Sequence, residues 1–173
     1  MLGAAQSTMR QNYINGGPGV SISGLAWLSA AIVTHLVGFQ WGMLTLFIGG
    51  MLIVPISGVI ENTMKGDVSA PDKGLTRLAL LTLPLLFGGL FLGYVLSFQS
   101  EALFFETVAV AIGLRYLVFS HVYGLKTFVV LGAMLAATGI TAYLIPIELA
   151  LTPAVVGIVE LLIGVFLILQ DRN

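Results

Sequence analysis

The chain contains no cysteine and very little charge, and both shortages narrow the classes of protein to which it can belong. Without cysteine there is no disulfide, no thiolate metal site and no cysteine nucleophile. Only 9% of the 173 residues are charged, whereas a soluble domain usually has about 25%. The formal net charge of −1 also argues against nucleic acid as a partner, because phosphate binding needs a basic face.

Long apolar segments take the place of the missing charge. Hydrophobic residues make up 58% of the chain and the mean hydropathy is +1.04, which indicates an integral membrane protein. A helix needs about 20 apolar residues to cross the roughly 30 Å hydrocarbon layer, and the runs here are continuous rather than alternating as in a barrel strand. The sequence therefore predicts an all-α fold, a single transmembrane domain over residues 1–173 that forms a compact bundle of six helices. The spans are expected at about 20–39, 41–60, 75–98, 102–120, 125–145 and 149–169.

Basic residues gather on one side of the predicted membrane. Five of the seven fall in the termini and in the second and fourth connections, and the other two lie nearest the same side: Arg10, Lys65, Lys73, Lys126 and Arg172, then Arg77 and Arg115. The opposite side has Glu101 and Glu148 and neither Lys nor Arg. The positive-inside rule then predicts cytoplasmic termini and a cytoplasmic loop over residues 61–74, in the cell inner (plasma) membrane.

Two features of the spans concern helix packing. The segments WGMLTLFIGG (41–50) and YGLKTFVVLG (123–132) align without gaps, which suggests two inverted three-helix repeats like those of many transporters. Similar glycine-rich composition without a repeat is the alternative. Small residues four apart are predicted to be helix-packing contacts, namely Gly89 with Gly93, Gly132 with Ala136 and Ala133 with Ala137.

Few polar side chains lie inside the spans, so these carry most of the functional information. Glu160 lies near the middle of the sixth span and Arg115 about 6 Å closer to the cytoplasm, so an Arg115–Glu160 ion pair is allowed. His35 and Glu106 share a depth near the outer side, which allows a second pair. Because an uncompensated charge at the bilayer centre costs several kcal/mol, Glu160 must be paired, protonated or facing water.

Glu106 and Arg115 are nine residues apart in one span. Nine steps of about 100° place them on opposite sides of the helix, so the fourth span should be central, with neighbours on both faces. Purely structural roles stay open for all four residues. Glu106 can reach the headgroups, Arg115 can snorkel to the interface, Glu160 can sit in a buried ion pair, and His35 can hydrogen-bond between helices.

Catalytic and cofactor motifs are largely missing. The sequence has no HExxH, no GxSxG and no Walker loop. His35 and His121 lie near opposite faces, so no shared metal or haem, and no other cofactor, is expected. The NGGPG stretch (15–19) resembles an anion-binding loop, but such a stretch is more often a turn that leads into a helix with proline near its first position.

Three longer segments point to a family. YINGGPGVSISGLAWL in the first span, TLFIGGMLIVPIS in the second and GLRYLVFSHVYGLK at the end of the fourth resemble a family of small bacterial multi-span membrane proteins catalogued as a domain of unknown function. The resemblance runs from about Tyr13 onward. It implies a bacterial inner membrane and supplies no activity, substrate or site.

Two functions of different class follow. The first is a small-solute or ion permease with a charged site at Glu160 and Arg115 near the midplane, with a small solute or proton as its cargo. The second is a non-transporting scaffold or accessory subunit in which the same pair fixes helix register. An enzyme is the least favoured reading, with His35 and Glu106 as its acid–base couple. Besides the lipid bilayer, the expected partner is a second copy of the chain in a homodimer, or a separately encoded subunit.

Overall fold

The computed structural model describes residues 2–65, 70–145 and 147–172, and the regular structure in these residues is helical. The elements are α1 (Leu2–Tyr13), η1 (Ile14–Gly16), α2 (Gly17–Val37), α3 (Phe39–Lys65), α4 (Lys73–Leu80), α5 (Leu83–Ser97), α6 (Ala102–Tyr123), α7 (Thr127–Leu144) and α8 (Leu151–Arg172). Within the described residues, six stretches of helix are long and apolar enough to cross a membrane. The predicted all-α, multi-pass architecture is therefore confirmed.

The third predicted span is not one continuous helix. It is divided between α4 and α5 at Leu81 and Thr82. Pro84 in the first turn of α5 accounts for the break, because a proline ring clashes with the carbonyl four residues earlier, here that of Leu80 at the end of α4. Residues 66–69 of the predicted loop 61–74 lie outside the described residues.

The connection between α2 and α3 is as short as the sequence suggested. Only Gly38 separates the two helices, and its φ of +116° is a conformation that favours glycine. Its N–H donates to the carbonyls of Val33 and Thr34, which closes the end of α2.

The N-terminal segment forms a helix, α1, that the sequence analysis did not predict. It joins α2 through a turn in which Ile14, Asn15 and Gly16 have φ values of 51°, 56° and 76°. Asn and Gly tolerate this left-handed region well, and Pro18 follows in the first turn of α2. The turn is buried, so NGGPG is a packed helix start rather than an open anion-binding loop.

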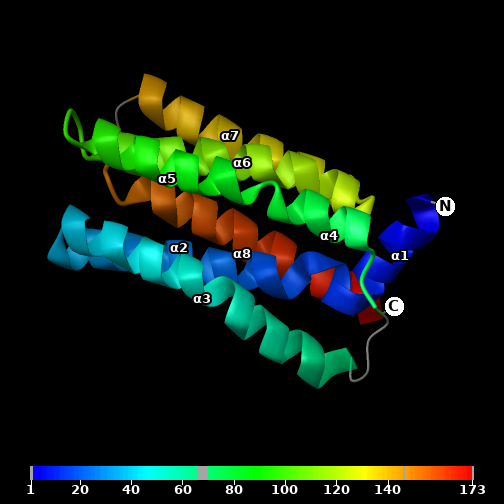
Figure 1. Cartoon of the computed structure of the whole chain (residues 1–173). Coiled ribbons are helices and arrows are strands. Elements are labelled where there is room, and N and C mark those ends of the chain that lie inside the picture. Colours follow the sequence, from blue (N-terminus) through cyan, green and yellow to red (C-terminus); the bar gives the residue numbers. More distant parts are fainter. Residues whose placement is uncertain (1, 66–69, 146, 173) are drawn as a thin grey trace.

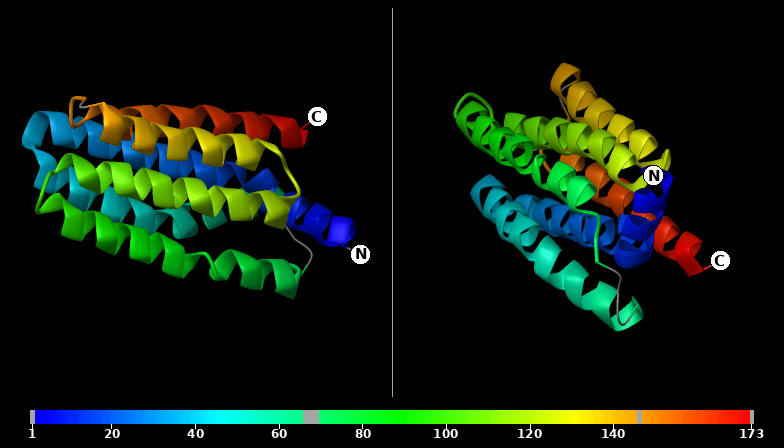
Figure 2. Two further views of the ribbon diagram at one scale, coloured as in Figure 1. Left: turned by 90° about the horizontal axis from the view of Figure 1, so that it is seen from above. Right: turned by 45° about the vertical axis from the view of Figure 1, so that its right-hand side comes forward.

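The helices form two layers (Figure 1). One layer contains α5, α6 and α7, and the other contains α3, α2 and α8, as the views of Figure 2 also show. Within the layers α2 packs against α3 and α8, and α6 packs against α5 and α7, while α7 and α6 contact α8 across the layers. α6 also touches α1 and α4, in agreement with a central fourth span. Each half of the chain contributes to both layers, and the inverted repeat stays a prediction.

Glycines allow the closest contacts between α2 and α8. A Cβ atom on Gly24 would lie 2.6 Å from the Leu161 nitrogen, and one on Gly157 would lie 2.8 Å from the Leu28 nitrogen. Real Cβ atoms essentially never come within 3.0 Å of another heavy atom. The two backbones therefore approach to a distance that only glycine permits at these positions.

The predicted small-residue contacts are partly confirmed. A Cβ atom on Gly93 would lie 3.1 Å from the Phe104 carbonyl oxygen, so α5 meets α6 there. Gly132 and Ala136 face α6, where a Cβ atom on Gly113 would lie 2.8 Å from the Ala136 nitrogen. Ala133 and Ala137 are both exposed in the described chain, so the third pair stays a prediction.

Two aromatic clusters fill the space between the layers. Near the α2–α3 turn, Trp27 and Phe39 contact Phe105, with ring centroids 6.2 and 6.0 Å apart. Toward the other end, the rings of Tyr123 and Phe128 stack at 5.1 Å. Both clusters belong to the hydrophobic core of the bundle.

Both chain termini lie at the same end of the bundle (Figure 1), together with the beginnings of α4 and α7. Arg10, Lys73 and Lys126 lie in or next to these segments, and Lys65, the last residue of α3, pairs with Asp171 near the C-terminus. The uneven distribution of basic residues along the sequence is thus an uneven distribution between the two ends of the folded molecule.

Leucine at Gly24 is expected to force α2 away from α8 and lower the free energy of unfolding by about 1–3 kcal/mol. The new side chain would meet α8 backbone, which cannot move aside as a flexible side chain can. Gly19→Leu in the same helix is the matched control, because a Cβ atom there has no neighbour within 4 Å. Thermal unfolding in neutral detergent, followed by tryptophan fluorescence, measures both. Equal melting temperatures for the two variants would contradict this packing.

Candidate functional site

Glu160 lies inside the bundle where α2, α6 and α8 meet. Its side chain is 0% exposed. The Tyr116 hydroxyl of α6 donates to Glu160 Oε1 over 2.7 Å, and the Ser23 hydroxyl of α2 lies beside both groups. The second oxygen, Oε2, makes no hydrogen bond of good geometry among the described residues. The carboxyl group therefore links two helices and has no contact with solvent or lipid.

Arg115 does not form the predicted ion pair with Glu160. Its Nε donates to Thr82 Oγ1 over 3.0 Å, and no Arg115–Glu160 contact within 4.0 Å is found in the described residues. Its guanidinium carbon lies 4.9 Å from the centre of the Phe119 ring. Arg115 and Tyr116 are adjacent on α6, so they point about 100° apart. Because Tyr116 faces α8, Arg115 faces the break between α4 and α5.

His35 and Glu106, whose shared depth allowed a pair, are not paired with each other. His35 Nδ1 lies 3.0 Å from Glu148 Oε1, and the two side chains are 64% and 68% exposed. Both residues are near the end of the bundle opposite the termini, as their shared depth predicted, but His35 lies on the surface of α2 while Glu106 is buried. No shared acid–base couple is formed.

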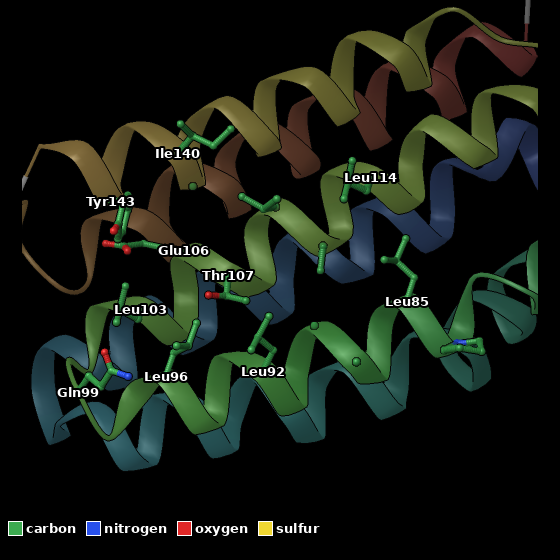
Figure 3. A pocket seen from close by; sticks show the side chains of 16 residues that line it. Leu85, Leu92, Leu96, Gln99, Leu103, Glu106, Thr107, Leu114, Ile140 and Tyr143 are labelled. Atoms are coloured by element: carbon green, nitrogen blue, oxygen red, sulfur yellow. The ribbon is translucent and has the colours of Figure 1, made fainter.

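Glu106 lies beside a lateral groove between α5, α6 and α7 (Figure 3). The groove has a volume of about 700 Å³. Glu106 is 7% exposed, and its Oε2 has no hydrogen-bond partner among the described residues. Gln99 and Tyr143 line the same end, and most of the remaining lining is apolar. A carboxyl oxygen without a hydrogen-bond partner thus lies next to a surface that is otherwise mostly apolar.

A second groove separates α3 from α5. It has a volume of about 410 Å³ and is lined by aromatic and aliphatic side chains, including Phe47, Phe87, Phe91 and Tyr94. Neither groove is lined by Glu160 or Arg115. The two buried carboxyl groups therefore occupy different environments, one enclosed and one open to a groove.

Metal binding finds no support in the arrangement of side chains. Within residues 2–65, 70–145 and 147–172, no three His, Cys, Asp or Glu side chains are grouped so that they could hold a metal ion.

The Family of unknown function (DUF7010) has a model that matches residues 2–170. The chain belongs to this family. No curated protein and no solved structure matches the chain. The resemblance to an uncharacterised family is confirmed, and this DUF7010 member inherits neither an activity nor site residues from it. Bacterial origin stays a prediction.

Sequence reasoning missed several polar side chains that complete these sites in the DUF7010 chain. Tyr116 and Ser23 surround Glu160, Thr82 receives Arg115, and Tyr143 lines the groove with Glu106. Tyr116 carried a usable signal, because a tyrosine hydroxyl buried in a membrane bundle needs a hydrogen-bond partner and few acceptors are available. Ser23 and Thr82 could not be separated from the many other small hydroxyl residues.

Tyr116→Phe removes the hydroxyl donor of Glu160 and is expected to lower the free energy of unfolding by about 1–3 kcal/mol. Combining it with Glu160→Leu should recover part of that loss, because the carboxyl group that lost its donor is then removed as well. Tyr94→Phe is the matched control, since Tyr94 is 46% exposed. Melting temperatures in neutral detergent provide the comparison. Glu160→Leu alone completes the comparison. If the losses of stability caused by Tyr116→Phe and by Glu160→Leu added up to the loss caused by the double change, Tyr116 and Glu160 would not interact.

Proposed function

We propose that this multi-pass membrane protein is a small-solute permease that receives its solute in the groove between α5, α6 and α7. The observation that carries the proposal is the Glu106 carboxyl, 7% exposed and with an unpartnered oxygen at the groove. Burying a polar group without a partner is costly, and intramembrane ionisable groups commonly mark solute pathways. A concave apolar surface with a few polar groups is also the usual form of a small-molecule site.

The element best placed to move is α5. It packs against α6 and lines both grooves, the first one with α6 and α7 and the second one with α3. The break at Leu81 and Thr82 separates it from α4, so it can tilt without moving the cytoplasmic end of the bundle. Movement of α5 toward α3 would narrow the second groove and widen the first. We infer that this motion opens and closes the path of the solute.

Glu160 supports a second candidate function. Its complete burial and its hydrogen bond to Tyr116 are what a structural centre requires, since they hold α6 against α8 and fix the register of the helices. A scaffold or accessory subunit needs nothing more. The permease proposal therefore assigns Glu160 a structural role and places solute binding at Glu106.

Locking α5 to α3 is expected to stop transport. The chain has no cysteine, so Leu44→Cys with Phe91→Cys, on the two walls of the second groove, can be joined by a cleavable bis-maleimide. Release of radiolabelled tetraethylammonium from neutral-lipid vesicles should exceed that of protein-free vesicles and fall at least tenfold after cross-linking. Cleavage of the linker should restore it.

The two single-cysteine variants, treated with the same reagent, serve as controls and should keep full release. Release equal to that of protein-free vesicles, from vesicles that contain folded wild-type protein, would refute the permease and leave the scaffold. Release that is unaffected by the cross-link would refute a moving α5.

We propose further that both termini are cytoplasmic. All seven basic residues lie in, or nearest to, the segments on the same predicted side of the membrane as the termini. Cytoplasmic loops are the ones that carry excess Lys and Arg. In a bacterial host, a fluorescent protein fused after residue 173 should fluoresce, and alkaline phosphatase fused at the same place should be inactive. An active phosphatase would reverse the orientation. The predicted homodimer stays a prediction.

A further inference from the structure

The groove between α5, α6 and α7 is polar at one end only. Gln99, Glu106 and Tyr143 lie at the end where α5 joins α6 (Figure 3). From Leu96 to Pro84 the wall formed by α5 is made of leucine, glycine and proline. A ligand that fits this surface has a polar head at the outer end and an apolar body toward the middle of the membrane.

The shape of the groove favours a single extended chain. Its wall on α5 runs from Pro84 to Gln99, which is about 22 Å along a helix. A volume of about 700 Å³ spread over that length leaves a narrow channel rather than a round cavity. Gly88 widens it, because nothing lies within 4 Å of the position where its Cβ atom would be.

The charge of the polar end selects the head group. Glu106 is the one charged residue among the described side chains that line the groove. Glu101 and Glu148 are near the same end of the bundle, and the sequence places neither Lys nor Arg there. A cation that approaches Glu106 gains an ion pair in a poorly solvated place, and the Tyr143 ring adds an aromatic face of the kind that binds alkylammonium groups.

We propose that the groove binds an amphiphile with one apolar chain and an amine or quaternary ammonium head, with the head placed against Glu106. The biological use of this site rests on the proposed permease function. Binding itself needs no transport, so the two can be tested apart.

Native mass spectrometry from neutral-detergent micelles can measure the binding of three probes with the same chain, namely hexadecyltrimethylammonium, hexadecyl maltoside and hexadecyl sulfate. The wild-type protein should bind the cation at least tenfold more tightly than the sulfate. Glu106→Gln should reduce the affinity for the cation at least tenfold and leave that for the maltoside unchanged. Glu101→Gln, which removes a charge outside the groove, should behave like the wild type. Equal affinity of wild type and Glu106→Gln for the cation would overturn the proposal.

A second pair of variants tests the position of the chain. Gly88→Leu should fill the groove and weaken both the cationic and the maltoside probe, whereas Gly50→Leu on α3, which also has open space around its Cβ position, should not. Unchanged binding by Gly88→Leu with an unchanged melting temperature would overturn the site. Displacement of the cation by phosphatidylcholine, which carries the same head on two chains, would overturn the single-chain assignment.

These outcomes separate the inference from the proposed function. Glu106-dependent binding without tetraethylammonium release would keep the site and refute the permease. Release that survives Glu106→Gln would refute solute binding at Glu106, whereas unchanged binding of the cationic probe by Glu106→Gln would refute this ligand site.

Discussion

Close backbone contact at glycine is the constraint on which the rest of this bundle depends. Helices in lipid gain no hydrophobic energy by associating, so contacts must come from close packing and hydrogen bonds. Gly24 and Gly157 bring α2 onto α8, and Gly113 and Gly132 bring α6 onto α7. These pairs are the rigid parts of the two layers. The outer helices α3 and α5 each have one main neighbour, and the space beside them is where both grooves lie.

The same packing explains why a carboxyl group can be enclosed at Glu160. Glu160 is fully buried beside the close contact of α2 with α8, so the group must find its partners within the protein. Tyr116 and Ser23 supply hydroxyl groups from the two other helices. Arg115 makes its hydrogen bond at the break instead, where Thr82 provides a polar acceptor. The hydrogen bond thus holds α6 against α8, and the surrounding helices keep Glu160 away from solvent.

Much of the fold could be predicted from the sequence, because depth along a membrane helix follows directly from residue number. Counting residues along the apolar segments was enough to predict the number of spans, the short connection between the first two of them, and the shared depth of His35 and Glu106. The pairings could not be obtained this way, since they depend on how each helix is rotated about its axis. Ala133 and Ala137 illustrate the same limit, because their spacing suits a helix interface but their side of α7 faces outward. α1 was missed because its own residues are not strongly apolar.

Rotation about the helix axis also decides what the two buried glutamates do. Glu106 and Glu160 have the same chemistry, and both lie in apolar helices. On α8, Glu160 points toward two helices that supply hydroxyl groups, so its contacts are internal to the protein. On α6, Glu106 lies beside Tyr143 at the polar end of the groove (Figure 3), and one of its oxygens lacks a hydrogen-bond partner within the described chain. The unpaired oxygen of Glu106 is itself buried, but the residue lines the groove, so a small movement of its side chain would present the carboxyl group to another molecule. For this reason ligand binding is assigned to Glu106 and structural support to Glu160.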